Sequence, residues 1–322
     1  MKLQYLNSVI CLCLSLALGL SSAHALDVDK EDARSLSHYI TGLYCEDLGD
    51  IDRAIQEYRK ALDTDAQSSL LHLNLASVYI KKDDTLSAVA ELKQSINLAP
   101  DAVEPHAILA LVYTTQNKSD LATQEYALAL KNAAKLEPGN IEIYKNLGAI
   151  YLQQRKLKEA EGIFKLIVGM APLDAQAHFY LGGIYYDLKD YPATEKELKA
   201  AIKLKPDYHE ALNFLGYFYL EQDRNIDKAG AMIKKALSFD SENGAYVDSL
   251  GWFYFKKGKS KEALSELERA ASFLSDPIIY EHLGDVFLKL GNRDNAKLNW
   301  EKSLKLDSAQ EKVKEKLLRV YQ

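Results

Sequence analysis

The sequence predicts an all-α solenoid of repeated helix-turn-helix units, and three observations support this fold class. Gly148, Gly182 and Gly216 lie 34 residues apart, each preceded by Leu and followed three residues later by Tyr. A second small residue usually follows twelve positions later, and a bulky residue four positions after that. Apolar residues recur at the i, i+3, i+4, i+7 spacing of a helix face. Such a fixed period indicates stacked supersecondary units rather than one globular domain.

The repeating unit can be followed over almost the whole chain. The Leu-small-x-x-aromatic motif recurs within further repeats at Leu75, Leu109, Leu250 and Leu283, and a degenerate first copy of it begins at Thr41. We expect a short N-terminal segment over 26–34 and a capping helix over 311–322. Between them, eight repeats are predicted at about 35–68, 69–102, 103–140, 141–174, 175–208, 209–243, 244–276 and 277–310.

Each copy is expected to form two amphipathic helices joined by a short polar or Gly-containing turn. The small residues leave room for a neighbouring helix, and Pro ends several copies because it cannot continue a helix interior. Pro192 fits the first turn of a second helix, where a missing N–H costs little. The third copy is four residues longer, about one helical turn, so its buried face keeps its phase. Residues 311–322 are charged on one side and apolar on the other, as a terminal cap requires.

The first 25 residues differ from the rest and predict a secretory signal peptide. Lys2 is their only charge, an apolar run covers 9–20, and Ala23-His24-Ala25 is a small-x-small cleavage site. The apolar run is short for a membrane span. We therefore expect cleavage after Ala25, a periplasmic or secreted protein and no stable membrane insertion; a retained anchor is the alternative.

Charge and cysteine content restrict the classes of partner that this chain could bind. Removing the signal peptide takes away one base and no acid, so the formal net charge of −6 becomes −7. No basic stripe is evident, which argues against nucleic acid. Cys45 is the only cysteine after position 25, and we interpret it as a small buried hydrophobe because it replaces the Tyr of other copies.

These repeated residues resemble the tetratricopeptide repeat family over about residues 35–310. The shared pattern is a small residue at the eighth, twentieth and twenty-seventh positions, aromatics between them and a closing Pro, as at Pro100, Pro138, Pro172 and Pro206. The resemblance implies a right-handed superhelical solenoid.

No catalytic, cofactor or metal site emerges from the residues. His38, His72, His106 and His178 share the fourth position of their copies, which Tyr144 occupies in another, so this is a packing position. Adjacent copies lie some ~8–10 Å apart or more, too far for several of these His to bind one zinc. The stretch 258–260 mimics a phosphate-binding loop but lacks its first Gly and does not follow a strand. A non-enzymatic protein is therefore expected.

The resemblance also implies a binding groove on the concave face. In this family the second, fifth, ninth, twelfth and thirteenth positions of each first helix point inward. Aromatics with carboxylates and amides suit an apolar or extended peptide; the alternative is packing alone. We expect Trp252 to be a binding residue whose removal leaves the fold nearly intact, since Tyr254 already supplies the core aromatic. The candidate groove residues are Phe179, Tyr186, Asn213, Tyr217, Asp248, Trp252, Phe255, Glu281 and Asp285.

Two further comparisons of motifs bear on the partner. The family's clamp for chaperone tails is missing, because Ala149 replaces the required Asn after Lys145. The stretch 243–252 resembles bacterial exported repeat proteins, some of which hold envelope proteases and their substrates together. We therefore expect a non-catalytic scaffold that binds polypeptide of one or more envelope proteins. The alternatives are an adaptor for an envelope protease or cell-wall hydrolase, and a structural component of a secretion or polysaccharide-export assembly.

Overall fold

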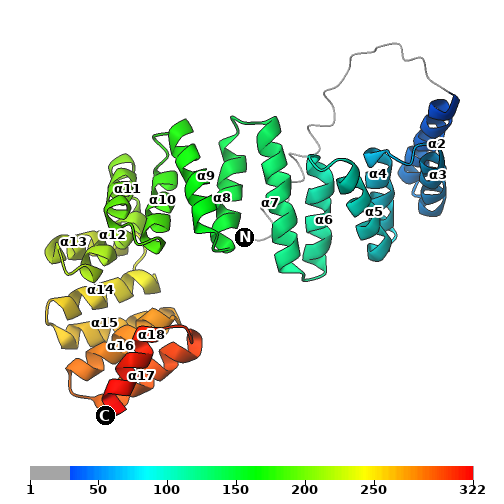
Figure 1. Cartoon of the computed structure of the whole chain (residues 1–322). Coiled ribbons are helices and arrows are strands. Elements are labelled where there is room, and N and C mark those ends of the chain that lie inside the picture. Colours follow the sequence, from blue (N-terminus) through cyan, green and yellow to red (C-terminus); the bar gives the residue numbers. More distant parts are fainter. Residues whose placement is uncertain (1–29, 322) are drawn as a thin grey trace. The chain divides into compact units, whose positions relative to one another are not determined.

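The computed structural model describes residues 30–321, and all 17 secondary-structure elements of this part are α-helices (Figure 1). The predicted all-α repeat architecture is therefore confirmed. The predicted signal peptide and its cleavage site lie outside the described residues. The chain divides into two compact units, with unit 1 ending at Lys156 and unit 2 beginning at Leu157. This boundary falls inside the range predicted for the fourth repeat.

Unit 1 consists of consecutive helices in which each first helix packs against the second helix of its own repeat and that second helix against the next repeat. No helix in the described part of the chain is long and apolar enough to cross a membrane. The helices of unit 1 are α2 (Lys30–Asp47), α3 (Ile51–Thr64), α4 (Ser69–Lys81), α5 (Thr85–Leu98), α6 (Val103–Thr115), α7 (Ser119–Leu136) and α8 (Ile141–Gln153).

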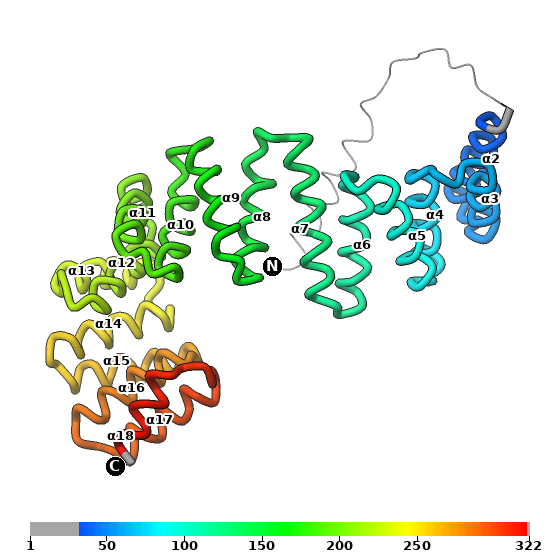
Figure 2. Tube along the Cα trace, viewed as in Figure 1, coloured from blue at the N-terminus to red at the C-terminus, as the bar shows by residue number. Residues whose placement is uncertain are grey.

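Unit 2 continues the same pattern of paired helices, which the trace in Figure 2 shows lying side by side from α14 to α17. Helix α18 packs against α17. The helices of unit 2 are α9 (Leu157–Met170), α10 (Ala175–Asp187), α11 (Tyr191–Leu204), α12 (His209–Glu221), α13 (Ile226–Leu237), α14 (Gly244–Lys256), α15 (Ser260–Phe273), α16 (Pro277–Lys289), α17 (Arg293–Leu306) and α18 (Glu311–Tyr321).

The turn between the two helices of a repeat contains a residue with a positive φ in each of the eight copies. In six copies the next residue is the N-cap of the second helix. Glycine, which adopts this conformation without strain, occupies three of the eight positions. The equivalent residues are Gly49, Asp83, Asn117, Arg155, Lys189, Asp223, Gly258 and Gly291.

Two irregularities of the repeat have structural explanations. Helix α7 has 18 residues where α5 has 14, so the four extra residues of the third copy add one helical turn. In the sixth copy the small residue Ala229 comes one position late. The turn before it contains a second left-handed residue, Asn225, with φ of 52°. This residue absorbs the insertion, and Ala229 remains fully buried.

The repeated small residues permit the close approach of paired helices. A Cβ built on Gly182 would lie 2.9 Å from Cγ of Leu198, and one on Gly251 would lie 2.7 Å from Cγ of Leu267. The bulky residue sixteen positions after the glycine thus packs directly against it. This contact repeats through the array and connects the two helices of a copy.

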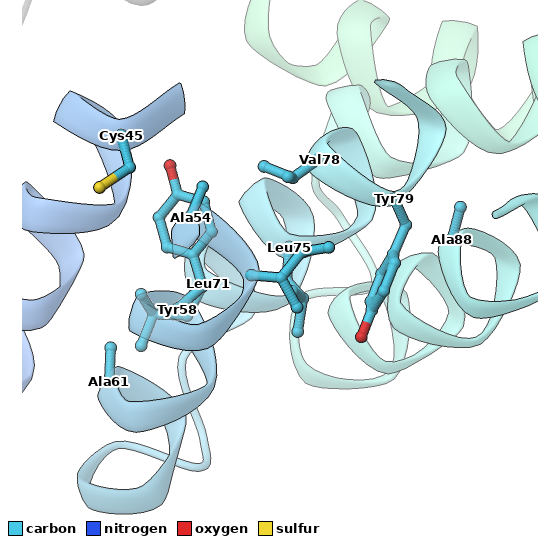
Figure 3. Close-up of a cluster of buried hydrophobic side chains, with 10 residues drawn as sticks. Cys45, Ala54, Tyr58, Ala61, Leu71, Leu75, Val78, Tyr79 and Ala88 are labelled. Atoms are coloured by element: carbon cyan, nitrogen blue, oxygen red, sulfur yellow. The ribbon is translucent and has the colours of Figure 1, made fainter. Parts of the chain in front are cut away.

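The core of the first repeats shows how neighbouring copies share one interior (Figure 3). Tyr58 and Leu75 are buried between helices of successive copies, and Cys45 is only 3 % exposed. The interpretation of Cys45 as a small buried hydrophobe is confirmed. Because each repeat lacks an interior of its own, stability comes from stacking on its neighbours.

Candidate functional site: two adjoining pockets in unit 2

The candidate site lies on the first helices of successive repeats in unit 2. Helix α14 contacts both α12 and α16, so equivalent positions of three successive repeats come close together on these helices. Two pockets lie on this surface, and they share the side chains of Tyr217 and Ile278. The repeat period therefore brings residues about 34 positions apart together on one continuous surface.

The first pocket, here called the apolar pocket, has a volume of about 240 Å³. Its walls include Phe214, Leu274, Ile278 and Ile279, which present hydrocarbon surface. Asn213 also lines it, and the Oδ1 atom of this side chain is buried without a hydrogen-bond partner among the described residues. The lining is nevertheless mainly apolar, so this pocket suits an apolar group of a ligand.

The second pocket, here called the polar pocket, has a volume of about 470 Å³. Tyr186 and Tyr217 line it together with the carboxylates of Glu221, Glu281 and Asp285. Burial, followed by the charge of Glu221, raises the pKa of both Tyr186 and Tyr217 above the usual value. Both phenols therefore stay neutral at physiological pH and can donate or accept hydrogen bonds.

A buried His–Asp pair connects the two pockets, with His282 lining the polar pocket and Asp248 the apolar one. Nδ1 of His282 lies 2.8 Å from Oδ1 of Asp248, which joins α16 to α14. The His282 ring stacks on Trp252 with a centroid distance of 3.9 Å, and Nε1 of Trp252 donates a hydrogen bond of 2.8 Å to Glu221. Burial opposes the charged imidazole, but the surrounding carboxylates, Asp248 first, outweigh it and raise the His282 pKa.

The capping helix closes the far end of the polar pocket. Nζ of Lys316 on α18 lies 2.6 Å from Oε1 of Glu281 and 2.7 Å from Oδ2 of Asp285. Asp285 also accepts a hydrogen bond from Nε1 of Trp300 on α17. These contacts hold α18 against the preceding repeat, so α18 also shapes the site.

The nine sequence-predicted residues divide into three groups in the structure. Asn213, Tyr217 and Asp248 line the apolar pocket, and Tyr217 is shared with the polar pocket. Phe179 and Phe255 line neither pocket. Phe179 packs against Tyr208 and Phe214, and Phe255 stacks on Trp252. Each therefore contacts a residue that lines a pocket. The predicted residues lining the polar pocket are Tyr186, Tyr217, Trp252, Glu281 and Asp285.

The structure corrects the expectation for Trp252. Its side chain lies between His282 and Phe255 and is only 7 % exposed. The expectation that its removal leaves the fold nearly intact conflicts with this burial, even though Tyr254 is also present. Trp252 is a packing residue whose edge reaches the pocket and orients Glu221.

Three residues that shape the polar pocket escaped the sequence-based list. Glu221 occupies the thirteenth position of the sixth repeat, which the family pattern already marks as inward-facing. His282 stands at a sixth position, and its partner Asp248 is 34 residues earlier. Lys316 belongs to the cap. Glu221 could have been found from its position; the other two depend on contacts between neighbouring repeats.

The fourth-position histidines form a second recurring contact. In each case Nδ1 lies 2.6 Å from a Glu on the second helix of the same repeat, 19 residues later. Among residues 30–321 no group of three or more His, Cys, Asp and Glu side chains is arranged to hold a metal ion. The histidines therefore join paired helices. The pairs are His38–Glu57, His72–Glu91, His106–Glu125 and His178–Glu197.

Stability is expected to fall as the pH rises above about 6.5. The pKa of His106 is raised by Glu125, and that of His282 is raised by its carboxylates. Because the pKa of each histidine is higher in the folded state, its protonated form stabilises the fold fully at pH values below its unfolded-state pKa. This contribution is lost as the pH rises through its folded-state pKa. The melting temperature measured across this range should decline, and Asp248→Asn should flatten part of the decline. A melting temperature that rises with pH would contradict this assignment.

The fold and site define a helical-repeat protein with a pocketed inner surface. Comparison with family models specifies the repeat: three stretches, residues 47–112, 146–193 and 278–310, match models of the tetratricopeptide repeat. The chain therefore carries tetratricopeptide repeats, as the sequence pattern predicted. This architecture is a scaffold for protein–protein interaction.

Individual relatives are distant. The bovine BBSome complex member BBS4 is 22% identical over 256 residues, covering 78% of this chain and 47% of that protein. The TPR repeat-containing protein PA4667 of Pseudomonas aeruginosa is 32% identical over 96 residues, covering 30% of this chain and 16% of that protein. The matched stretches of this chain thus span less than half the length of either relative. A crystal structure of a tetratricopeptide repeat protein from Parabacteroides merdae matches 80% of this chain and all of that chain, with a TM-score of 0.59 and 18% identity, which shows a shared fold.

Proposed function

We propose that this protein is a non-catalytic scaffold that binds an extended segment of another polypeptide in the two pockets of unit 2. The observation that carries the proposal is the pair of adjoining pockets over α12, α14 and α16, one lined mainly by apolar side chains and the other by tyrosines and charged groups. An extended peptide fits such a surface, because its backbone offers N–H and C=O groups throughout and its side chains alternate along the chain.

The wider surface supports the same ligand class. Tyr186 and Tyr217 offer large flat contact areas with polar tips, a combination favoured where peptides bind. Both pockets lie over α12, α14 and α16, the apolar pocket towards the N-terminal ends of these helices and the polar pocket further along them. A peptide running along these helices would contact both pockets, whereas a compact small molecule would use only one.

We propose the bacterial cell envelope as the place of action, on the basis of the N-terminal sequence. The single charge at Lys2, the apolar run 9–20 and the Ala23-His24-Ala25 site are typical of an exported protein. The N-terminal residue of the purified protein tests this, since export with cleavage predicts a chain beginning at Leu26. A retained segment 1–25 would favour an anchored protein instead.

An adaptor role is the second candidate, and the sequence 243–252 favours it. This stretch contributes Asp248 and Trp252 to the pockets and resembles exported repeat proteins of which some hold a protease and its substrate. An adaptor of this kind would alter the activity of an envelope protease or hydrolase when added to it. A pure scaffold would bind the same partner without changing its rate.

The binding proposal is tested by selecting random 12-residue peptides on the chain 26–322. We expect selected peptides to lose at least about tenfold in affinity for Ile278→Glu, because a carboxylate would enter the rim shared by both pockets. Leu86→Glu is the matched control, since Leu86 is 85 % exposed on a helix of unit 1. Equal loss in both variants, or no selected peptide, would contradict the proposal.

A further inference from the structure

The polar pocket differs from the apolar pocket in its distribution of charge. Its buried cations already have carboxylate partners: His282 pairs with Asp248, and Lys316 pairs with both Glu281 and Asp285. Lys256 lies 2.7 Å from Oδ1 of Asp223. These three basic groups are therefore paired within the protein itself, whereas Lys312, which also lines the pocket, is exposed on α18.

Glu221 is the carboxylate of the pocket that lacks a cation. Its Oε1 accepts a hydrogen bond from Nε1 of Trp252, a neutral donor, and it forms no ion pair with any residue in the described part of the chain. The Trp252 indole is held by stacking on both His282 and Phe255, so it fixes the orientation of the carboxylate. Glu221 is thus a half-buried negative charge that points at an open cavity from a rigid support.

The neighbours of Glu221 suit a cation on an apolar stem. Tyr186 and Tyr217 line the same pocket, and neither is paired with a charged group. Aromatic rings and phenolic oxygens attract a cation, and their hydrocarbon surface packs against an alkyl chain. A carboxylate in the same place would be repelled by Glu221 and by the excess negative charge of the Glu281, Asp285 and Lys316 cluster.

We propose that Glu221 recognises a basic side chain, Lys or Arg, of the bound polypeptide, two residues from an apolar side chain held in the apolar pocket. The spacing follows from the shared walls of the two pockets, because side chains i and i+2 of an extended chain point to the same side about 7 Å apart. This inference rests on the proposed function and specifies its ligand as an apolar-x-basic motif.

The test uses the highest-affinity peptide from the random 12-residue selection. Its basic residue is replaced by norleucine, which keeps an alkyl stem and removes the charge, and binding is measured by fluorescence anisotropy. We expect the charged peptide to bind about tenfold more tightly than the norleucine peptide. In Glu221→Gln, whose amide oxygen can still accept from Trp252, the two peptides should bind alike, with the affinity of the norleucine peptide retained.

Glu210→Gln is the matched control, because Glu210 lies on the same helix α12, is half-exposed and lines neither pocket. This variant should keep the tenfold preference. Selected peptides without a basic residue, or a preference that persists in Glu221→Gln, would overturn the assignment of Glu221 while leaving peptide binding itself intact. Failure to select any peptide would overturn both the binding proposal and this one.

Discussion

Trp252→Ala should lower the free energy of unfolding of unit 2 by about 3–5 kcal/mol, the cost typical of truncating a buried aromatic. The indole is sandwiched between His282 and Phe255, and its N–H holds Glu221. Its removal leaves a cavity and exposes the buried His282–Asp248 pair. Because each repeat is stabilised mainly by its neighbours, weakening the seventh copy also weakens its contacts with the sixth and eighth.

Urea unfolding followed by circular dichroism measures this loss. Trp252→Phe is the matched control, since it preserves an aromatic ring between His282 and Phe255 and removes only the hydrogen bond to Glu221. We expect this variant to recover most of the lost stability. A loss below about 1 kcal/mol for Trp252→Ala would show that the ring contributes little packing and would return it to the group of binding residues.

Gly216→Leu should destabilise the same unit by about 3 kcal/mol or more. A Cβ at this position would lie 2.8 Å from Cγ1 of Ile233 and 3.0 Å from the backbone oxygen of Ala229. The oxygen belongs to helix α13, so relief requires α12 and α13 to separate rather than a side chain to rotate. That separation would also disturb the packing of Phe253 and other apolar residues in the same cluster.

Gly162→Leu provides the comparison for this prediction. Gly162 also lies within a helix of unit 2, but a Cβ built there meets no heavy atom of the described residues within 4 Å. Replacement should therefore be neutral or stabilising, because Leu favours helix more than Gly does. Thermal unfolding of both variants tests this prediction. Equal melting temperatures would refute the claim that Gly216 permits the close packing of α12 against α13.

The features predicted well from sequence are those that repeat within one copy. The spacing of Gly182 and Leu198 anticipated a tight pair of helices, and the extra residues of the third copy appear as one added turn in α7. Six of the eight turn residues are Gly, Asn or Asp, which tolerate a positive φ, whereas Arg155 and Lys189 give no such signal. These relations depend on local helix geometry, which a single chain segment determines.

The features missed by sequence reasoning arise between copies. The stacking of His282 on Trp252 and the ion pairs of Lys316 require knowledge of how one repeat is placed on the next. The sequence analysis assigned Trp252 to the binding surface because Tyr254 already supplied the core aromatic. It did not anticipate the burial of Trp252, because that depends on the placement of the next repeat. The inward-facing positions of the family nevertheless led to seven of the residues that line the two pockets.

Site-specific photo-cross-linking tests the central claim, peptide binding in the pockets of unit 2, most directly. The photoreactive residue p-benzoylphenylalanine is placed at position 278 or, as a control, at position 86, and each chain is irradiated with a selected 12-residue peptide. Mass spectrometry then locates the attached peptide. Attachment at position 278 and not at position 86 is the predicted result. Attachment at position 86 alone, or equally at both positions, would contradict the account.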